Sequence, residues 1–174
     1  MPNIMKPSIV EKPAFLVVGV RTLWNLDPAV PEKLWVEQFL PHRQKINAAP
    51  GTSNSAFGVF NRIPDMHERM FEYVAGMMVP SLEDIPPGMV GWEIPDGTYA
   101  SATIRGIENI YSAYCDIMES WLPTSEFTLI DGPVFTISSN LANPADPTAF
   151  WQVNVHVKGQ HKNDLKSEVA AWKL

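Results

Sequence analysis

Glu37-Gln38-Phe39-Leu40-Pro41 recurs later in the chain as Glu119-Ser120-Trp121-Leu122-Pro123. The two copies lie 82 residues apart, and the same offset places segment 14–22 on segment 96–104. Both of these segments have the short, apolar and β-branched composition of a buried strand. A shared offset therefore indicates an internal repeat rather than a chance match.

The same offset carries a third segment, Phe71–Ala75, onto Val153–Val157. Two related units are therefore expected, at about residues 9–79 and 91–161. A chain of 174 residues is of ordinary single-domain size, so we expect one domain over residues 1–174 in which both units share a core.

Within each unit the pattern predicts strand, helix, strand, strand. In the first unit, Phe15–Arg21 is the entry strand, and a helix opens at Pro31, because proline is favoured in a first helical turn. Pro41 ends this helix, since its ring removes a backbone donor and clashes with the preceding turn. The second unit repeats the order, which makes the fold class α+β with duplicated β-α-β-β units.

Composition excludes several classes of protein. A net charge of −6 argues against direct nucleic acid binding, which needs concentrated Lys and Arg. The longest apolar run, 14–20, is too short to span a membrane, and the first residues do not resemble a secretory signal. A single cysteine, Cys115, excludes an internal disulfide and a Cys-based zinc site. We therefore expect a cytoplasmic protein.

We expect no metal and no cofactor, because the histidines show no ligand spacing. They are His42, His67, His156 and His161.

The last predicted strand has two chemically different faces. Val153, Val155 and Val157 alternate with Gln152, Asn154 and His156, and successive strand side chains point to opposite faces. We expect the valine face to pack on the helices, near Ile110, Ile117 and Trp121, and the polar face to meet a ligand.

Several stretches, in this order, carry a resemblance to a known family. They are Lys12-Pro13-Ala14, Gly58-Val59, Phe71-x-Tyr73-x-Ala75-Gly76, Ile94–Ala100 and Trp121–Ser125. Together they resemble the GyrI-like family, the small-molecule effector-binding domain of bacterial AraC-type and multidrug-responsive regulators. The resemblance implies a curved, antiparallel, barrel-like sheet with two main helices and a pocket near a pseudo-twofold axis. It also implies bulky, often aromatic or cationic ligands.

One position departs from the family pattern. Family members often have a pocket glutamate in the last strand, where this chain has Gln152. A neutral amide cannot balance a buried cation, so neutral ligands are favoured unless Glu72 or Glu93 supplies the charge. On this interpretation, a Gln152→Glu substitution would shift the preference toward cations.

The sequence and the resemblance together give a predicted ligand-binding set. Its members are Glu72, Tyr73, Trp92, Tyr99, Phe135, Trp151, Gln152 and Asn154. We expect other aromatics on helical stripes to belong to the core instead, namely Trp35, Tyr111 and Trp121.

The leading hypothesis is a stand-alone binding protein that senses or sequesters small hydrophobic or aromatic compounds. No DNA-binding segment is expected before residue 8. One alternative is a hydrolase of a strained or activated small molecule, which would need Glu72, Tyr99 or His156 at one reacting centre. Another is an inhibitor that docks on a macromolecular enzyme as its protein partner.

Overall fold

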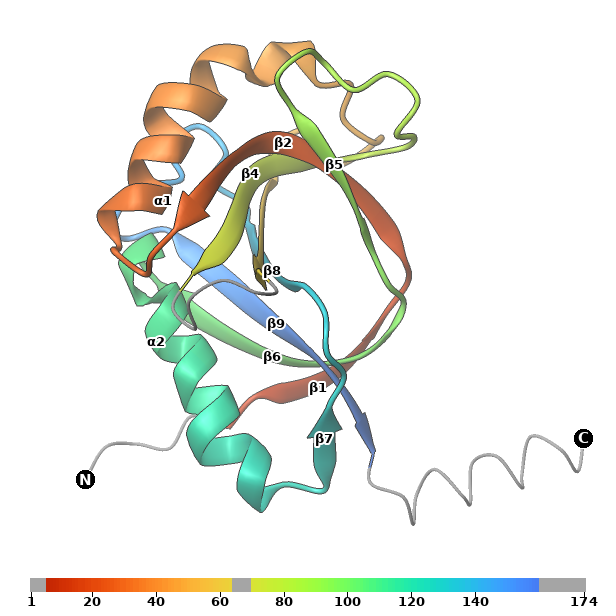
Figure 1. The fold of residues 1–174 in the computed structure, drawn as a ribbon, viewed down its shortest axis with the longest axis vertical. Helices are drawn as coiled ribbons and strands as arrows, with labels where there is room; N and C mark the ends of the chain where they lie inside the picture. The colour runs from red at the N-terminus through yellow and green to blue at the C-terminus, as the bar shows by residue number, and fades with distance from the viewer. Residues whose placement is uncertain (1–5, 64–69, 160–174) are drawn as a thin grey trace, which may run out of the picture.

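The computed structural model describes residues 6–63 and 70–159 (Figure 1). The strands of the described part are β1 (Ser8–Lys12), β2 (Phe15–Trp24), β3 (Ala56–Arg62), β4 (Phe71–Val79), β5 (Val90–Ile94), β6 (Gly97–Arg105), β7 (Phe127–Leu129), β8 (Val134–Ser138) and β9 (Phe150–Gly159). One long helical segment follows β2 and begins with α1 (Ala29–Lys33). A second follows β6 and contains α2 (Ile110–Cys115).

All nine strands join one curved sheet, in the order β1-β6-β9-β8-β3-β4-β2-β5, with β7 also paired to β9. Every pairing in the described residues is antiparallel. The sheet does not close, because β1 and β5 lie at its two ends. The predicted α+β fold, with a curved antiparallel sheet and two main helices, is confirmed.

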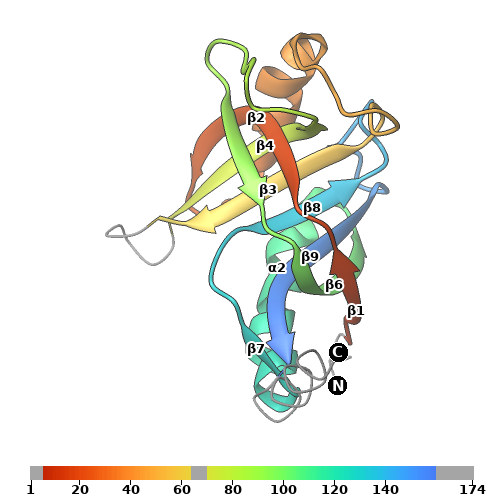
Figure 2. The ribbon, with the colours of Figure 1, turned by 90° about the vertical axis from the view of Figure 1, so that its right-hand side faces the viewer.

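The two halves meet where β3 pairs with β8 in the middle of the sheet (Figure 2). Leu16 pairs with Val79 in the first half, and Thr98 pairs with Val157 in the second. The first strands are thus 82 residues apart, as expected, but the last strands are 78 apart.

The expected match of Phe71–Ala75 with Val153–Val157 is therefore wrong by four residues. The inner strands give the same result, because Phe57 pairs with Gly76 and Phe135 pairs with Asn154, both shifted by 78. The shorter offset arises after the helices, because Ala56 follows Pro41 by 15 residues (56 − 41) whereas Val134 follows Pro123 by 11 (134 − 123). A shift by an even number keeps each side chain on its face of the sheet.

Both long helices change their pitch in front of a proline. α1 widens to a π-helix over Leu34–Phe39 and then tightens to a 3-10 helix over Leu40–Lys45. The second helix does the same, with a π segment at Asp116–Trp121 and a 3-10 turn at Leu122–Thr124. Proline cannot donate to the preceding turn, so the α-helical ladder cannot continue through it.

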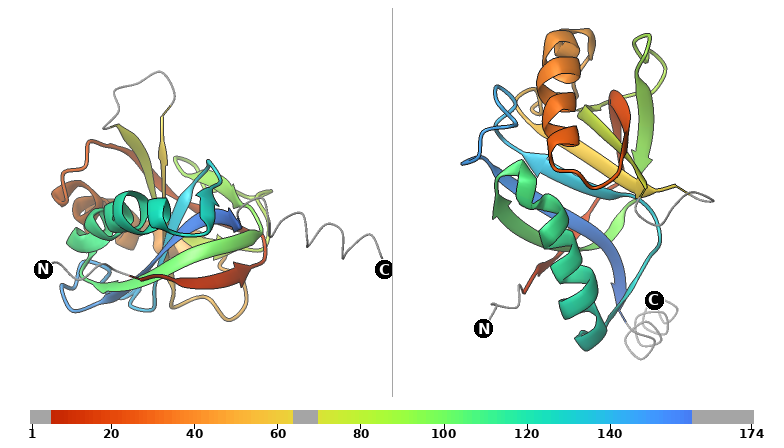
Figure 3. Two further views of the ribbon diagram at one scale, coloured as in Figure 1. Left: turned by 90° about the horizontal axis from the view of Figure 1, so that it is seen from below. Right: turned by 60° about the vertical axis from the view of Figure 1, so that its left-hand side comes forward.

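Both helices pack on one face of the sheet, where the main core lies (Figures 1 and 3). Val153, Val155 and Val157 belong to this core together with Ile110 and Ile117, as the alternation predicted. Trp121 is only partly buried against the same core, where its ring stacks on Phe127 at 5.7 Å.

A second apolar cluster fills the opposite face. Its buried members are Val17, Phe57, Val59, Val74, Ile94, Tyr99 and Phe135. The sheet thus separates two apolar clusters, one on each face. A side chain's position in the strand alternation decides which cluster it joins.

The β2–β4 ladder has a close approach of two glycines. Gly19 lies directly opposite Gly76. A methyl group on Gly76 would lie 2.4 Å from the carbonyl oxygen of Val18 and 2.9 Å from the Val17 side chain. Backbone cannot move aside as a flexible side chain can, so the two strands require glycine here.

Gly76→Ala should lower the free energy of unfolding by about 1–3 kcal/mol or more, because overpacking forces the ladder apart. Gly91→Ala is the matched control. There the added methyl group meets the far ends of Leu82 and Ile85, which can rotate away. Urea denaturation measures both variants, and an equal loss in both would contradict the close-approach explanation.

Candidate functional site

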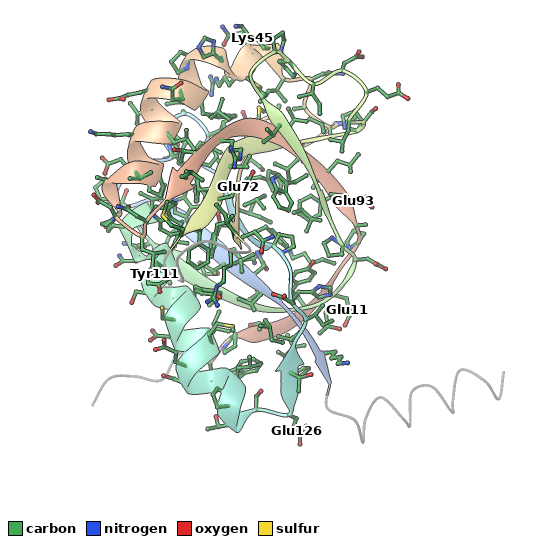
Figure 4. The ribbon with its side chains drawn as sticks, viewed as in Figure 1. Glu11, Lys45, Glu72, Glu93, Tyr111 and Glu126 are labelled. Atoms are coloured by element: carbon green, nitrogen blue, oxygen red, sulfur yellow. The ribbon has the colours of Figure 1, made fainter. Side chains whose placement is uncertain are left out.

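One cleft lies at the starts of the two helices, on the side of the sheet that the helices cover. Its volume is about 440 Å³, within the range of small-molecule sites. Both halves of the chain contribute to its lining: Trp24, Leu26, Pro28, Pro31, Tyr73, Ile107, Glu108, Ile110, Tyr111, Ser112 and Cys115. Figure 4 labels Tyr111, which lies where the two helices approach each other.

Tyr73 forms the base of the cleft from strand β4. Its side chain is fully buried, and its hydroxyl oxygen accepts a hydrogen bond of 2.9 Å from the indole nitrogen of Trp35. Burial raises the pKa of Tyr73 well above its ordinary value, although hydrogen bonds with Trp35 and Thr136 act in the other direction. The base of the cleft is therefore polar but uncharged.

Trp151 lies behind this base, on strand β9. It is fully buried, and its ring centroid lies 5.7 Å from that of Trp35. Its indole nitrogen has no hydrogen-bond partner within the described part of the chain. A buried donor without a partner costs about 1–3 kcal/mol.

Aromatic rings make the inner wall of the cleft. The ring of Trp24 lies 5.5 Å from that of Tyr73 and 6.0 Å from those of Phe71 and Tyr111. The Trp24 indole nitrogen donates a 2.9 Å hydrogen bond to the carbonyl of Asp27, which fixes the ring against the turn into α1. Such planar rings offer large contact areas with little loss of entropy.

Leu26 stands at the mouth of the cleft with a strained backbone. Its φ angle is 76°, a left-handed conformation that bulky residues rarely adopt. Pro28 follows two residues later and also lines the cleft. Strain of this kind is concentrated at functional sites.

The outer wall contains the only cysteine of the chain. Cys115 and Tyr111 share a hydrogen bond, which together with burial raises the pKa of Tyr111 to about 12. Burial also raises the pKa of the Cys115 thiol. The thiol is thus protonated near neutral pH, which does not suit a nucleophile.

Charge is scarce in this cleft. Among its described lining residues, Glu108 alone carries a full charge, and its side chain is exposed at the mouth. Since the base supplies only neutral polar groups, an apolar ligand can enter without burying an unpaired charge.

The structure divides the predicted ligand-binding set between the two faces of the sheet. Tyr73 lines the cleft, and Trp151 lies behind it. Trp92, Tyr99 and Phe135 belong instead to the apolar cluster on the opposite face.

The three polar members of the set also lie on that opposite face. Glu72 forms an ion pair with Arg21 at 2.7 Å. Asn154 is buried and donates to the Phe135 carbonyl at 3.4 Å, while its own oxygen has no partner among the described residues. Gln152 lies next to it in the alternation of β9, so none of the three reaches the cleft.

The sequence interpretation missed most of the cleft, including Trp24, Leu26, Pro28 and Glu108. One signal was present, because Trp24 ends a strand and is followed by a turn closed by Pro28.

The predicted core residue Trp35 is fully buried. Tyr111, also predicted to be core, is only partly buried because it faces the cleft.

The three residues considered for hydrolysis do not converge on one centre with free polar groups. Tyr99 and His156 stack at 4.6 Å, but the Tyr99 hydroxyl donates to the Pro95 carbonyl. Burial lowers the pKa of His156, and Glu72 is held by Arg21.

His67 and His161 lie outside the described residues. Within the described ranges, no three His, Cys, Asp or Glu side chains gather as a metal site would require.

The chain belongs to the family of GyrI-like small-molecule-binding domains, whose family model matches residues 5–157. It is 33% identical over 102 residues to the transcriptional regulator BrlR of Pseudomonas aeruginosa. This match covers 59% of the chain and 36% of BrlR, so the chain corresponds to only about a third of that regulator.

Solved structures share the fold at low sequence identity. SAV2435 bound to tetraphenylphosphonium gives a TM-score of 0.62 at 12% identity, over 89% of this chain and 95% of that one. EcmrR, in a complex with DNA, gives 0.61 at 14% identity, over 87% of this chain and 57% of that one. In the described residues of the present chain, no helix is long and apolar enough to cross a membrane.

All four tyrosines have a pKa above the ordinary value of 10.0, and Tyr99 reaches about 12, chiefly through burial. The fold therefore favours the neutral phenols. Their contribution to stability is complete below pH 10.0 and is lost as the pH rises toward 12. Phenolate absorbance should appear later than in the urea-unfolded chain and together with loss of circular dichroism. Full ionisation near pH 10.0 in a still folded protein would contradict these environments.

Proposed function

We propose that this chain binds small, planar, largely apolar aromatic compounds in the cleft between its two helices. The observation that carries the proposal is the cleft itself, about 440 Å³ in volume, with Tyr73 at its base, Trp24 and Tyr111 in its walls, and one exposed charge. Rings of this kind stack on planar ligands, and apolar lining favours their transfer from water.

Two features of the related proteins favour a binding role. SAV2435 has been solved with tetraphenylphosphonium, a bulky aromatic cation, and the family is one of small-molecule-binding domains. BrlR is a transcriptional regulator, which favours sensing as the use of binding here, with sequestration as the alternative. We place this function in the cytoplasm, because a chain with one cysteine has no internal disulfide.

A substitution that fills the cleft tests the site. Ser112 is an exposed helix residue that lines the cleft, whereas Ser120 is exposed further along the same helix and lines none of the described cavities. Ser112→Phe should weaken binding of a planar aromatic dye at least about tenfold, which is about 1.4 kcal/mol. Ser120→Phe should leave binding unchanged.

The measurement is saturable quenching of tryptophan fluorescence, since Trp24 lies in the wall. Bound dye should also slow alkylation of Cys115, the only thiol of the chain. If a panel of neutral and cationic dyes gave no saturable signal, the proposed function would fail. Equal weakening by both serine substitutions would move the binding site elsewhere.

Charge preference gives a second test. Gln152 lies on the face opposite the cleft, so Gln152→Glu should leave the ratio of affinities for matched neutral and cationic dyes unchanged. This reverses the expectation drawn from the family pattern. Glu108→Gln should weaken only the cationic dye, by a factor of about five or less, because exposed charge pairs contribute at most about 1 kcal/mol. A clear shift toward cations in Gln152→Glu would place the ligand on the other face.

A further inference from the structure

A second cavity, of about 520 Å³, lies beside the cleft along the second helix. Its apolar floor is made by Phe60, Phe71, Met118 and Val134. Tyr114 forms the wall on the helix side, one helical turn from the cleft residue Tyr111. The cavity is large enough for one small aromatic molecule.

An aromatic partition separates this cavity from the cleft. The rings of Trp24, Phe60 and Phe71 contact one another, with centroids 5.5 Å (Trp24–Phe60), 6.0 Å (Trp24–Phe71) and 5.9 Å (Phe60–Phe71) apart. Trp24 lines the cleft, whereas Phe60 and Phe71 line the cavity. Tyr111 and Tyr114 continue the partition along the helix, with centroids 6.0 Å apart. Interlocked rings at such distances hold one another in place, so the two spaces are separate compartments.

The second cavity differs from the cleft in charge. Arg62 and Asp131 both line it, and both are exposed. The guanidinium carbon of Arg62 lies 5.9 Å from the Phe71 ring centroid, which places a positive charge over the apolar floor. Both charges act on the Tyr114 hydroxyl: burial raises the pKa of Tyr114, Arg62 lowers it and Asp131 raises it.

These two charges do not satisfy each other. The only ion pair within residues 6–63 and 70–159 is that of Arg21 with Glu72. Arg62 and Asp131 therefore offer a cation and an anion at one cavity, within reach of the same phenol. A purely anionic ligand would meet Asp131, and a purely cationic one would meet Arg62.

We propose that this cavity is a second binding site, for an aromatic zwitterion of the α-amino-acid class. The ring would lie on Phe60 and Phe71, the carboxylate on Arg62 and the ammonium group on Asp131. A guanidinium fork matches a carboxylate in geometry, and a zwitterion leaves neither protein charge uncompensated. The site is independent of the cleft and of the function proposed for it.

Three related ligands test the proposal by isothermal titration calorimetry. L-tryptophan carries both charges, tryptamine carries only the ammonium group, and indole-3-propionate carries only the carboxylate. The intact chain should bind L-tryptophan at least about fivefold more tightly than either analogue. No binding of L-tryptophan, or equal binding of an analogue, would overturn the proposal.

Single substitutions assign the charges. Arg62→Gln should weaken L-tryptophan and indole-3-propionate but not tryptamine, and Asp131→Asn should weaken L-tryptophan and tryptamine only. Arg105→Gln is the matched control, because Arg105 is an exposed arginine that lies 4.5 Å over the Phe150 ring, away from this cavity. An equal loss in Arg105→Gln would overturn the assignment.

A further measurement separates the two sites. In Ser112→Phe, which fills the cleft, L-tryptophan should bind as it does to the unmodified chain. Conversely, Arg62→Gln should leave dye binding in the cleft unchanged. Loss of L-tryptophan binding in Ser112→Phe would place the amino acid in the cleft and refute the second site, whereas loss of dye binding alone supports the cleft proposal.

Discussion

The hydrogen bond from Trp35 to Tyr73 ties the first helix to the sheet at the base of the cleft. Both side chains are fully buried, so the bond joins two groups that would each be costly to bury alone. It fixes the height of the helix above β4 and keeps the Tyr73 ring against Trp24. Rings packed on this pair, those of Phe39 and Trp151, then complete the contact between helix and sheet. Large rings fill the contact between this helix and the sheet. Within the described part of the chain, the start of the helix makes no such contact, and the open space there is the cleft.

The second half of the chain does not reproduce this bond. With the observed offsets, Trp151 takes the place of Tyr73 and Ile117 takes that of Trp35. An isoleucine offers no hydrogen-bonding group, which explains why the Trp151 indole nitrogen is left without a partner. Although the two units have the same element order, the first contributes polar groups to the base of the cleft and the second contributes an apolar one.

Sequence reasoning predicted the fold well because its signals are local and repeated. The Leu-Pro pairs mark the helix ends, and the Val153–Val157 alternation identifies the face under the helices. The site was less predictable, since alternation shows that a strand has two faces but not which face keeps an open space. Polarity favoured the face of Gln152 and Asn154, yet that interior is filled by Phe135, Tyr99 and their neighbours. Only the packing of three elements distant in sequence creates the cleft.

The scarcity of charge in the cleft and its presence in the neighbouring cavity follow from the same packing. Residues that face the helices between the two halves lie far from water, and an unpaired charge there would cost several kcal/mol. The cavity opens where β3 ends and β4 begins, and there the exposed Arg62 holds its guanidinium over the Phe71 ring while remaining accessible to water. One partition of aromatic rings therefore separates an apolar compartment from a charged one. On the functions proposed above, this partition would let one fold distinguish ligands by hydrophobicity on one side and by charge on the other.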